Sequence, residues 1–293
     1  MADCRRELKA QGWHVGWSKV HAGLGGRYST TLVQECLLKL KKDHKKDREA
    51  VAALCRHSVR VTLGEVLWSL DETHLGRLPS WKAVLGLVVR EVASTRTLLV
   101  SVGPEATAED LVRVLEHLRM TRGALPLALG IDNGPAMKSR LLLDYCTFHE
   151  VVLLRNLPYV SEHNAAVEHG HRELKEEAGL GKGVRLEDDA EAAARMAEAI
   201  ACVDGRRLRT TRGMKTAVAV DEETPRWYPR IERRVFYVAA CKAIGEALQG
   251  CQNARERRMA EREAILCTMQ RFGLISRTRG GEPIQAPIRK SIP

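Results

Sequence analysis

The chain lacks several features that would place it in other classes of protein. None of its eight cysteines forms a Cys-x-x-Cys pair, so zinc-finger spacing is absent and the scattered thiols indicate a reduced, cytosolic protein. No apolar run approaches the roughly 20 residues that span a bilayer, and the first residues do not read as a signal peptide. No internal repeat of about 20 to 50 residues is visible. We therefore expect a cytoplasmic protein with no membrane partner.

Positive charge is in excess, but it is concentrated at the two ends of the chain. The net formal charge of the 293 residues is +10. Residues 1–60 carry 13 basic and six acidic side chains, residues 225–293 carry 14 and six, and the middle carries 20 and 25. This order fits two flanks that bind a polyanion and a core that holds cations with carboxylates. Basic side chains that merely solvate helix faces are the alternative.

The first 60 residues predict a helix-turn-helix and a linker. Residues 13–24 and 29–46 place apolar side chains at helical spacing and are joined through Gly25 and Gly26. In a helix-turn-helix the second helix enters the DNA major groove. An ordinary helical hairpin with a solvated basic face is the alternative, and residues 43–58 read as a linker helix. The lysines of the second helix that would meet phosphates are Lys39, Lys41, Lys42, Lys45 and Lys46.

From residue 65 the pattern changes to short apolar runs that are typical of β-strands. Three such runs are followed by alternating helices and strands in the order β-β-β-α-β-α-β-α, which predicts an α/β fold with a mixed sheet flanked by helices. We expect a DNA-binding region at 1–60, a core at 61–215 and a basic helical region at 216–293. The elements expected after the three strands are a helix at 108–122, a strand at 125–132, a helix near 135–145, a strand at 151–154, helices at 164–178 and 187–202, a long helical stretch near 231–272 and an unstructured tail.

Three acidic side chains of the core stand at the ends of these elements. Asp71 lies near the end of the first predicted strand and Asp132 at the end of the fourth, while Glu168 lies one turn into a helix, with 35 residues between it and Asp132. Groups at strand ends line the ligand crevice of open α/β sheets. Carboxylate oxygens suit hard divalent cations, and two such ions stabilise both oxygens of a phosphodiester displacement. The pattern predicts a metal site for phosphate chemistry; three ordinary surface or capping acids are the alternative.

The helix that carries Glu168 also carries cations on the same face. Arg172 and Lys175 follow at i+4 and i+7, so they would bind phosphate beside the carboxylate. His171 could contact substrate, although a lone helix histidine is more often a surface residue. The other acids of this helix are expected on its solvated face: Glu173, Glu176 and Glu177.

Three motifs in this order resemble a known superfamily. They are W-S-L-D-E-T around Asp71, I-D-N-G-P around Asp132, and N-A-A-V-E-x5-L-K-E-E from Asn164 to Glu177. Together they look like the integrase core of DDE transposases and retroviral-type integrases, and the 35-residue gap is the signature spacing of that superfamily. The resemblance covers roughly residues 60–215. The helix-turn-helix and the arginine-rich residues 204–217 also resemble bacterial insertion-sequence transposases.

The resemblance implies an RNase H-like fold, two Mg2+ or Mn2+ ions, and 3′-end nicking and strand transfer at the ends of a mobile DNA element. It assigns catalysis and metal binding to Asp71, Asp132 and Glu168. Element terminal repeats and target DNA would be the partners of a homo-oligomer in the bacterial nucleoid, with the long carboxy-terminal helical stretch as the candidate surface for self-association. Besides the lysines above, the expected DNA contacts are Asn164, Arg172, Lys175, Arg207 and Arg209.

Two other functions stay open at the level of sequence. One is a catalytically silent, sequence-specific DNA-binding protein derived from a transposase, against which the complete acidic triad argues. The other is a stand-alone nuclease of the RNase H-like class, which gives less reason for the basic flanks.

Overall fold

The computed structural model describes residues 1–55, 58–156, 165–224, 230–279 and 282–285. The chain forms two compact units, Met1–Arg56 and His57–Pro293, which are described separately. None of the helices in these described ranges is long and apolar enough to cross a membrane.

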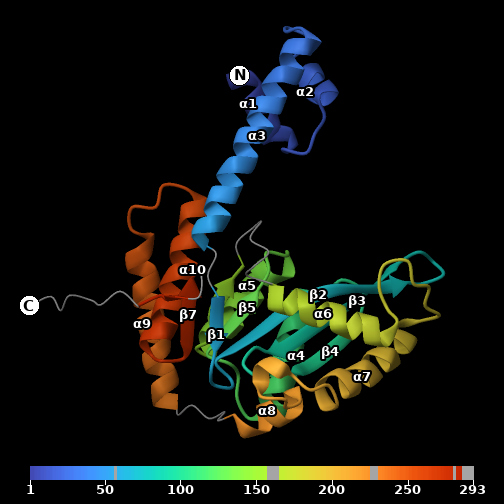
Figure 1. Cartoon of the computed structure of the whole chain (residues 1–293), viewed down its shortest axis with the longest axis vertical. Helices are drawn as coiled ribbons and strands as arrows, with labels where there is room; N and C mark the ends of the chain where they lie inside the picture. The colour runs from blue at the N-terminus through green and yellow to red at the C-terminus, as the bar shows by residue number, and fades with distance from the viewer. Residues whose placement is uncertain (56–57, 157–164, 225–229, 280–281, 286–293) are drawn as a thin grey trace, which may run out of the picture. The chain divides into compact units, whose positions relative to one another are not determined.

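The first unit consists of three helices around a small apolar core. These are α1 (Ala2–Gln11), α2 (Trp17–Gly23) and α3 (Thr30–Cys55) (Figure 1). The two predicted helices are present, but the second runs without a break through the expected linker. Helix α1 was not predicted from the sequence because its only buried side chains are Cys4 and Leu8. The remaining members of the core cluster are Val15, Val20, Leu24, Val33, Leu37 and Leu40.

The second unit is built on a five-stranded mixed sheet with the strand order β4-β3-β2-β5-β6. Strand β3 is antiparallel to β2 and β4, whereas β5 is parallel to both β2 and β6. The predicted order of elements and the mixed sheet flanked by helices are confirmed. The elements are β2 (Leu67–Arg77), β3 (Ala83–Glu91), β4 (Thr97–Gly103), α4 (Ala108–Arg122), β5 (Ala128–Ile131), α5 (Arg140–Phe148), β6 (Val152–Arg155), α6 (Ala165–Ala178) and α7 (Asp189–Gly205).

Helices cover both faces of this sheet. Side chains alternate between faces along a strand, so Trp68 and Leu70 of β2 pack with α4 and α5. On the other face Leu75 packs with α6 and α7, while Leu67 packs with the carboxy-terminal helices α9 (Arg230–Leu248) and α10 (Ala254–Arg271). Asp71 lies on β2 between these two clusters. It therefore belongs to the part of this face that lies between the helices α6 and α7 and the helices α9 and α10.

The carboxy-terminal region differs from the sequence prediction. The single helical stretch predicted near 231–272 is wrong: α9 and α10 are separate helices that pack on each other. The chain turns at Gly250, whose φ is +85°, and Asn253 caps α10 by accepting the backbone N–H groups of Arg255 and Glu256. The tail predicted to be unstructured contains β7 (Ile275–Arg279) and β8 (Glu282–Pro283), and β7 pairs with β1 (Ser58–Val61).

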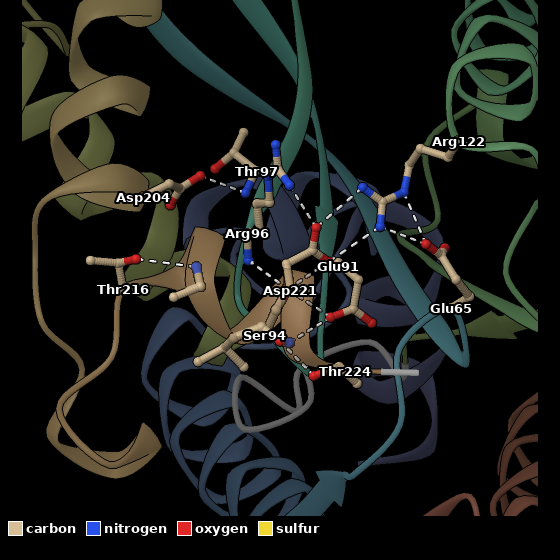
Figure 2. Close-up of polar contacts among 12 residues, drawn as sticks. Glu65, Glu91, Ser94, Arg96, Thr97, Arg122, Asp204, Thr216, Asp221 and Thr224 are labelled. Carbon is tan, nitrogen blue, oxygen red and sulfur yellow. Dashed lines mark hydrogen bonds and ion pairs between the residues drawn. The ribbon is translucent and has the colours of Figure 1, made fainter. Parts of the chain in front are cut away.

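A buried charged cluster fastens the short helix α8 (Ala217–Glu223) to the sheet (Figure 2). Arg122 at the end of α4 donates to Glu65 Oε1 at 2.5 and 2.9 Å and to Asp221 of α8 at 3.2 and 3.3 Å. Arg96 donates to the same aspartate at 2.7 Å. Removal of one partner from such a pair leaves an uncompensated buried charge. If α8 detached, Arg122 and Arg96 would lose their partner Asp221. This loss would cost free energy, so the cluster holds α8 in place.

Glu91 lies in the same region and predicts a dependence of stability on pH. Its Oε2 accepts hydrogen bonds from the Ser94 N–H at 2.5 Å and the Ser94 hydroxyl at 2.9 Å, but burial raises the pKa of Glu91 to about 7. The unfolded chain releases this proton near its ordinary pKa of 4.5. Between these values the folded state binds more protons, so the free energy of unfolding falls as pH rises.

We expect Glu91→Gln to remove this dependence. The stability of the wild type relative to the variant should decrease by roughly 3 kcal/mol between pH 4.5 and 7 and then level off. Urea unfolding at several pH values measures the difference. Glu198→Gln on the exposed face of α7 is the control and should give a flat difference. A flat difference for Glu91→Gln as well would show that the carboxyl ionises normally in the folded protein.

Candidate functional site at the carboxyl edge of the parallel strands

Strand register places two of the three predicted carboxylates side by side. Leu70 of β2 pairs with Ile131 of β5 in parallel, and Asp71 and Asp132 are the next residues. Equivalent positions of paired parallel strands point to the same face, with the strands about 4.8 Å apart. Asp71 lies within β2 rather than near its end as predicted, because β2 continues along β3; what ends there is the pairing with β5.

Helix α6 lies over the sheet (Figure 1), and His171 of this helix is buried. The imidazole is only 5% exposed, and its Nδ1 lies 3.9 Å from Oδ2 of Asp71. Burial, followed by the charges of Arg90 and Lys175, lowers the pKa of His171 to about 4. The ring is therefore neutral near pH 7, and its approach to Asp71 is a packing contact rather than an ion pair. The expectation that this histidine lies on the surface is wrong.

The contact with His171 brings the first turn of α6 towards the strand ends. Glu168 precedes His171 by three residues, and positions three apart are neighbours on one helix face. Glu168 is exposed, Arg172 is exposed, and Lys175 is partly buried. Asn164 lies outside the described residues. In those residues no group of three His, Cys, Asp or Glu side chains converges as a metal site.

A buried arginine under α6 sets how closely this helix approaches the sheet. Arg90 of β3 is 5% exposed and its Nη2 donates to the Thr95 carbonyl at 2.6 Å. A Cβ built on Gly170 would lie 0.9 Å from Nη1 of Arg90. Only a residue without a side chain leaves room for the guanidinium at this position. Gly170 lies between Glu168 and His171 in α6, so the spacing of the site depends on this contact.

The two arginines near the end of the core that were predicted to contact DNA form ion pairs with α6. Arg209 Nη1 donates to both carboxylate oxygens of Glu173, at 2.7 and 2.8 Å, and Arg207 pairs with Glu177. Glu173 is thus partly buried in an ion pair, contrary to the solvated face expected for it. Their role in DNA binding stays a prediction, and their observed role is to fasten α6.

The lysines predicted to meet DNA lie on α3. One of them forms a hydrogen bond inside the first unit. Lys41 is partly buried and its Nζ donates to the Val15 carbonyl at 2.6 Å, so it holds α3 against the preceding loop. The side chains of Lys39, Lys42 and Lys45 are exposed. Their contact with DNA stays a prediction.

The end of β6 completes the edge of the sheet beside Asp132. The backbone N–H of Asn156 donates to the Ile131 carbonyl at 2.9 Å, and Asn133 Nδ2 donates to the Asn156 carbonyl at 2.7 Å. These two bonds hold the residues on either side of Asp132. Sequence reasoning assigned no role to Asn156, and the only signal was its place after an apolar run.

The chemistry of this edge fits a hard divalent cation. Asp71 and Asp132 present carboxylate oxygens on one face, which are the ligands that Mg2+ and Mn2+ prefer. Glu168, the predicted third donor of the same type, lies on α6, the helix whose His171 approaches Asp71 at 3.9 Å. Sequence reasoning missed His171, Arg90 and Gly170 as structural determinants, because a histidine, an arginine and a glycine in isolation carry no recognisable pattern.

We expect Gly170→Ala to destabilise the second unit, although alanine favours a helix by about 1 kcal/mol. The added methyl displaces the buried Arg90 guanidinium, at an expected net cost of about 1 to 3 kcal/mol in urea unfolding. Gly245→Ala in α9 is the matched control, because a Cβ at that position would have no other atom within 4 Å, and should stabilise by about 0.5 to 1 kcal/mol. Equal stabilisation by both substitutions would contradict the constraint.

Part of this chain is similar in sequence to a retroviral polyprotein. No protein-family profile matches the chain. The Gag-Pol polyprotein of bovine immunodeficiency virus (strain R29) is 26% identical over 151 residues, which cover 47% of this chain and 9% of the polyprotein. The chain thus matches a small part of that relative.

Solved integrase structures are also similar to parts of this chain. The catalytic core domain of BIV integrase is 23% identical, with a TM-score of 0.42 over 55% of this chain and 95% of that chain. The HTLV-2 integrase catalytic core domain in complex with magnesium is 17% identical, with a TM-score of 0.44 over 55% and 99%. An intasome of simian T-cell lymphotropic virus in complex with a PP2A regulatory subunit is 16% identical, with a TM-score of 0.47 over 78% and 76%. The predicted resemblance to retroviral-type integrase cores is confirmed, whereas an origin in a bacterial insertion sequence stays a prediction.

Proposed function

We propose that this chain is a DDE-type transposase or integrase that nicks DNA at the 3′ ends of a mobile element and joins those ends to target DNA. The observation that carries the proposal is the parallel register of β2 and β5, in which Asp71 and Asp132 directly follow the paired residues Leu70 and Ile131. Similarity in sequence to a retroviral Gag-Pol polyprotein supports the same reaction class.

Three carboxylates would hold two Mg2+ or Mn2+ ions: Asp71, Asp132 and Glu168. Bound there, the ions would act as Lewis acids on the phosphodiester and on the attacking oxygen. The chain's own part is to fix Asp71 and Asp132 through strand register and to carry Glu168 on α6. In the proposed sequence of reactions, water first cleaves the strand and the freed 3′-hydroxyl then attacks target DNA, with no covalent bond between protein and DNA.

Cations near the carboxylates would bind the DNA backbone. Arg172 and Lys175 lie on α6 within two turns of Glu168, and the exposed lysines of α3 supply a second basic surface on the first unit. Neutralisation of phosphates releases counterions, so binding should weaken steeply with salt. We propose the element's terminal repeats as the ligand of the first unit and target DNA as the second DNA partner.

Cleavage of end DNA by an Asp132 variant tests the proposed reaction. Wild-type protein with Mg2+ and labelled DNA that carries the proposed terminal repeat of the element should release the nicked 3′ end. Asp132→Asn removes an anionic ligand and should slow cleavage by roughly 1000-fold, while end-DNA binding by gel shift persists. Asp144→Asn in α5 is the control, because Asp144 pairs only with Arg140 on the exposed surface among the contacts described. Unchanged cleavage in Asp132→Asn would rule out the assignment.

We further propose that the protein self-associates on paired DNA ends, because strand transfer of two ends requires both to be held together. Light scattering of the complex with end DNA should give a mass that includes at least two protein chains. A mixture of the protein with unrelated DNA should not give a complex of this mass. A complex with one protein chain per end under conditions of cleavage would contradict self-association. Association with the bacterial nucleoid stays a prediction that follows from DNA binding.

A further inference from the structure

The carboxy-terminal helix α10 reaches the edge of the sheet where the acidic residues lie. Arg262 of α10 is 7% exposed, and its Nη1 donates to the Arg155 carbonyl at 3.0 Å and approaches the Asn156 side-chain oxygen at 3.5 Å. Burial of a guanidinium is costly unless hydrogen bonds compensate for it. The main-chain bond to β6 is part of that compensation, so α10 and the end of β6 are held together by a buried cation.

The bond from Arg262 falls on an edge strand. Strand β6 is last in the order β4-β3-β2-β5-β6, so within the described part of the chain it has a neighbouring strand on one side only. Edge strands and strand ends are among the first segments of a protein to open locally. A donor from another element at the last carbonyl of β6 therefore acts where the sheet itself provides the least restraint.

Two further hydrogen bonds lead from the end of β6 to Asp132. Asn156 donates its N–H to the Ile131 carbonyl and accepts from Asn133 Nδ2, at 2.9 and 2.7 Å. Asp132 lies between the two residues that these bonds hold. Arg262, Asn156 and the residues around Asp132 form a continuous set of contacts from α10 to the carboxylate.

We propose that Arg262 is a positioning residue for Asp132, so that the basic carboxy-terminal region forms part of the site rather than an appendage to it. The inference rests on the proposed function, which assigns Asp132 as a metal ligand. Arg262 fixes the end of β6, Asn156 then fixes both neighbours of Asp132, and the carboxylate is thereby held at the end of β5. Such outer partners of a metal ligand contribute affinity by restricting its orientation.

A second buried arginine of the same region provides a matched control. Arg277 of β7 is 4% exposed and donates to both oxygens of Glu263 in α10, each at 2.8 Å. Its charge is as deeply buried as that of Arg262, but the partner is a side chain within the carboxy-terminal region. A purely structural role would make the two arginines equivalent, whereas a positioning role would not.

The experiment compares Arg262→Met, Arg262→Lys and Arg277→Met in the full-length protein. Mn2+ affinity is measured by the electron paramagnetic resonance signal of free Mn2+, and urea unfolding reports stability. Arg262→Met should weaken Mn2+ binding by about 10- to 100-fold. It should also increase amide hydrogen exchange in peptides covering 128–134 and 150–156. Arg277→Met should lower stability without either effect, and Arg262→Lys should recover part of the affinity, because an ammonium can still donate to the Arg155 carbonyl.

End-DNA cleavage separates this inference from the proposed function. For Arg262→Met, the Mg2+ concentration that gives half-maximal cleavage should rise more than the maximal rate falls. Equal loss of Mn2+ affinity in Arg262→Met and Arg277→Met, or no loss in either, would overturn the positioning role. Wild-type protein that binds Mn2+ but does not cut would overturn the proposed function alone, and the Mn2+ and exchange data would still decide the role of Arg262. A wild type that binds no Mn2+ would overturn both.

Discussion

The parallel pairing of β2 with β5 is the constraint on which the rest of the site depends. Parallel strands need a crossover connection, and here α4 lies in that crossover and packs its apolar side on Trp68 and Leu70. A slip of one residue would turn every side chain of β5 to the opposite face, so Asp132 would then face α4 and α5 instead of the part of the other face that contains Asp71. The hydrophobic core on that face thus determines the position of a polar pair on the other.

Helix α6 is placed by polar groups as much as by apolar ones. Leu174 is fully buried in the α6–α7 cluster, but beside it the helix meets the Arg90 guanidinium at Gly170 and brings a neutral His171 against Asp71. Arg209 then anchors the outer side through Glu173. Buried polar groups usually require partners, so the hydrogen-bonded Arg90 guanidinium and the Arg209–Glu173 pair restrict the placement of α6 more than the packing of apolar groups would. The distance of Glu168 from the strand ends follows from that placement.

The carboxy-terminal helices contribute to the same core as the sheet. Phe236 of α9 and Ile265 of α10 pack with Leu67, Val152 and other sheet residues in one cluster, and Arg262 reaches the main chain of β6. Charge alone had suggested a flank that grips DNA. The helices carry basic side chains on their exposed surface, and they also pack an apolar face on the sheet. This packing brings residues that are far apart in the sequence to the candidate site.

Sequence alone determined the identity and order of the elements of the core, because strand and helix periodicities and the three motifs are local patterns. It also placed Asp132 at a strand end and Glu168 at a helix start, and it predicted the mixed sheet. Only the tertiary structure decided that Asp71 lies within β2, that His171 and Glu173 are partly or fully buried, and that Arg90, Gly170 and Arg262 constrain the site. These features depend on contacts between distant segments, such as α10 with β6 or β7 with β1, and no short window of sequence records which segments will meet.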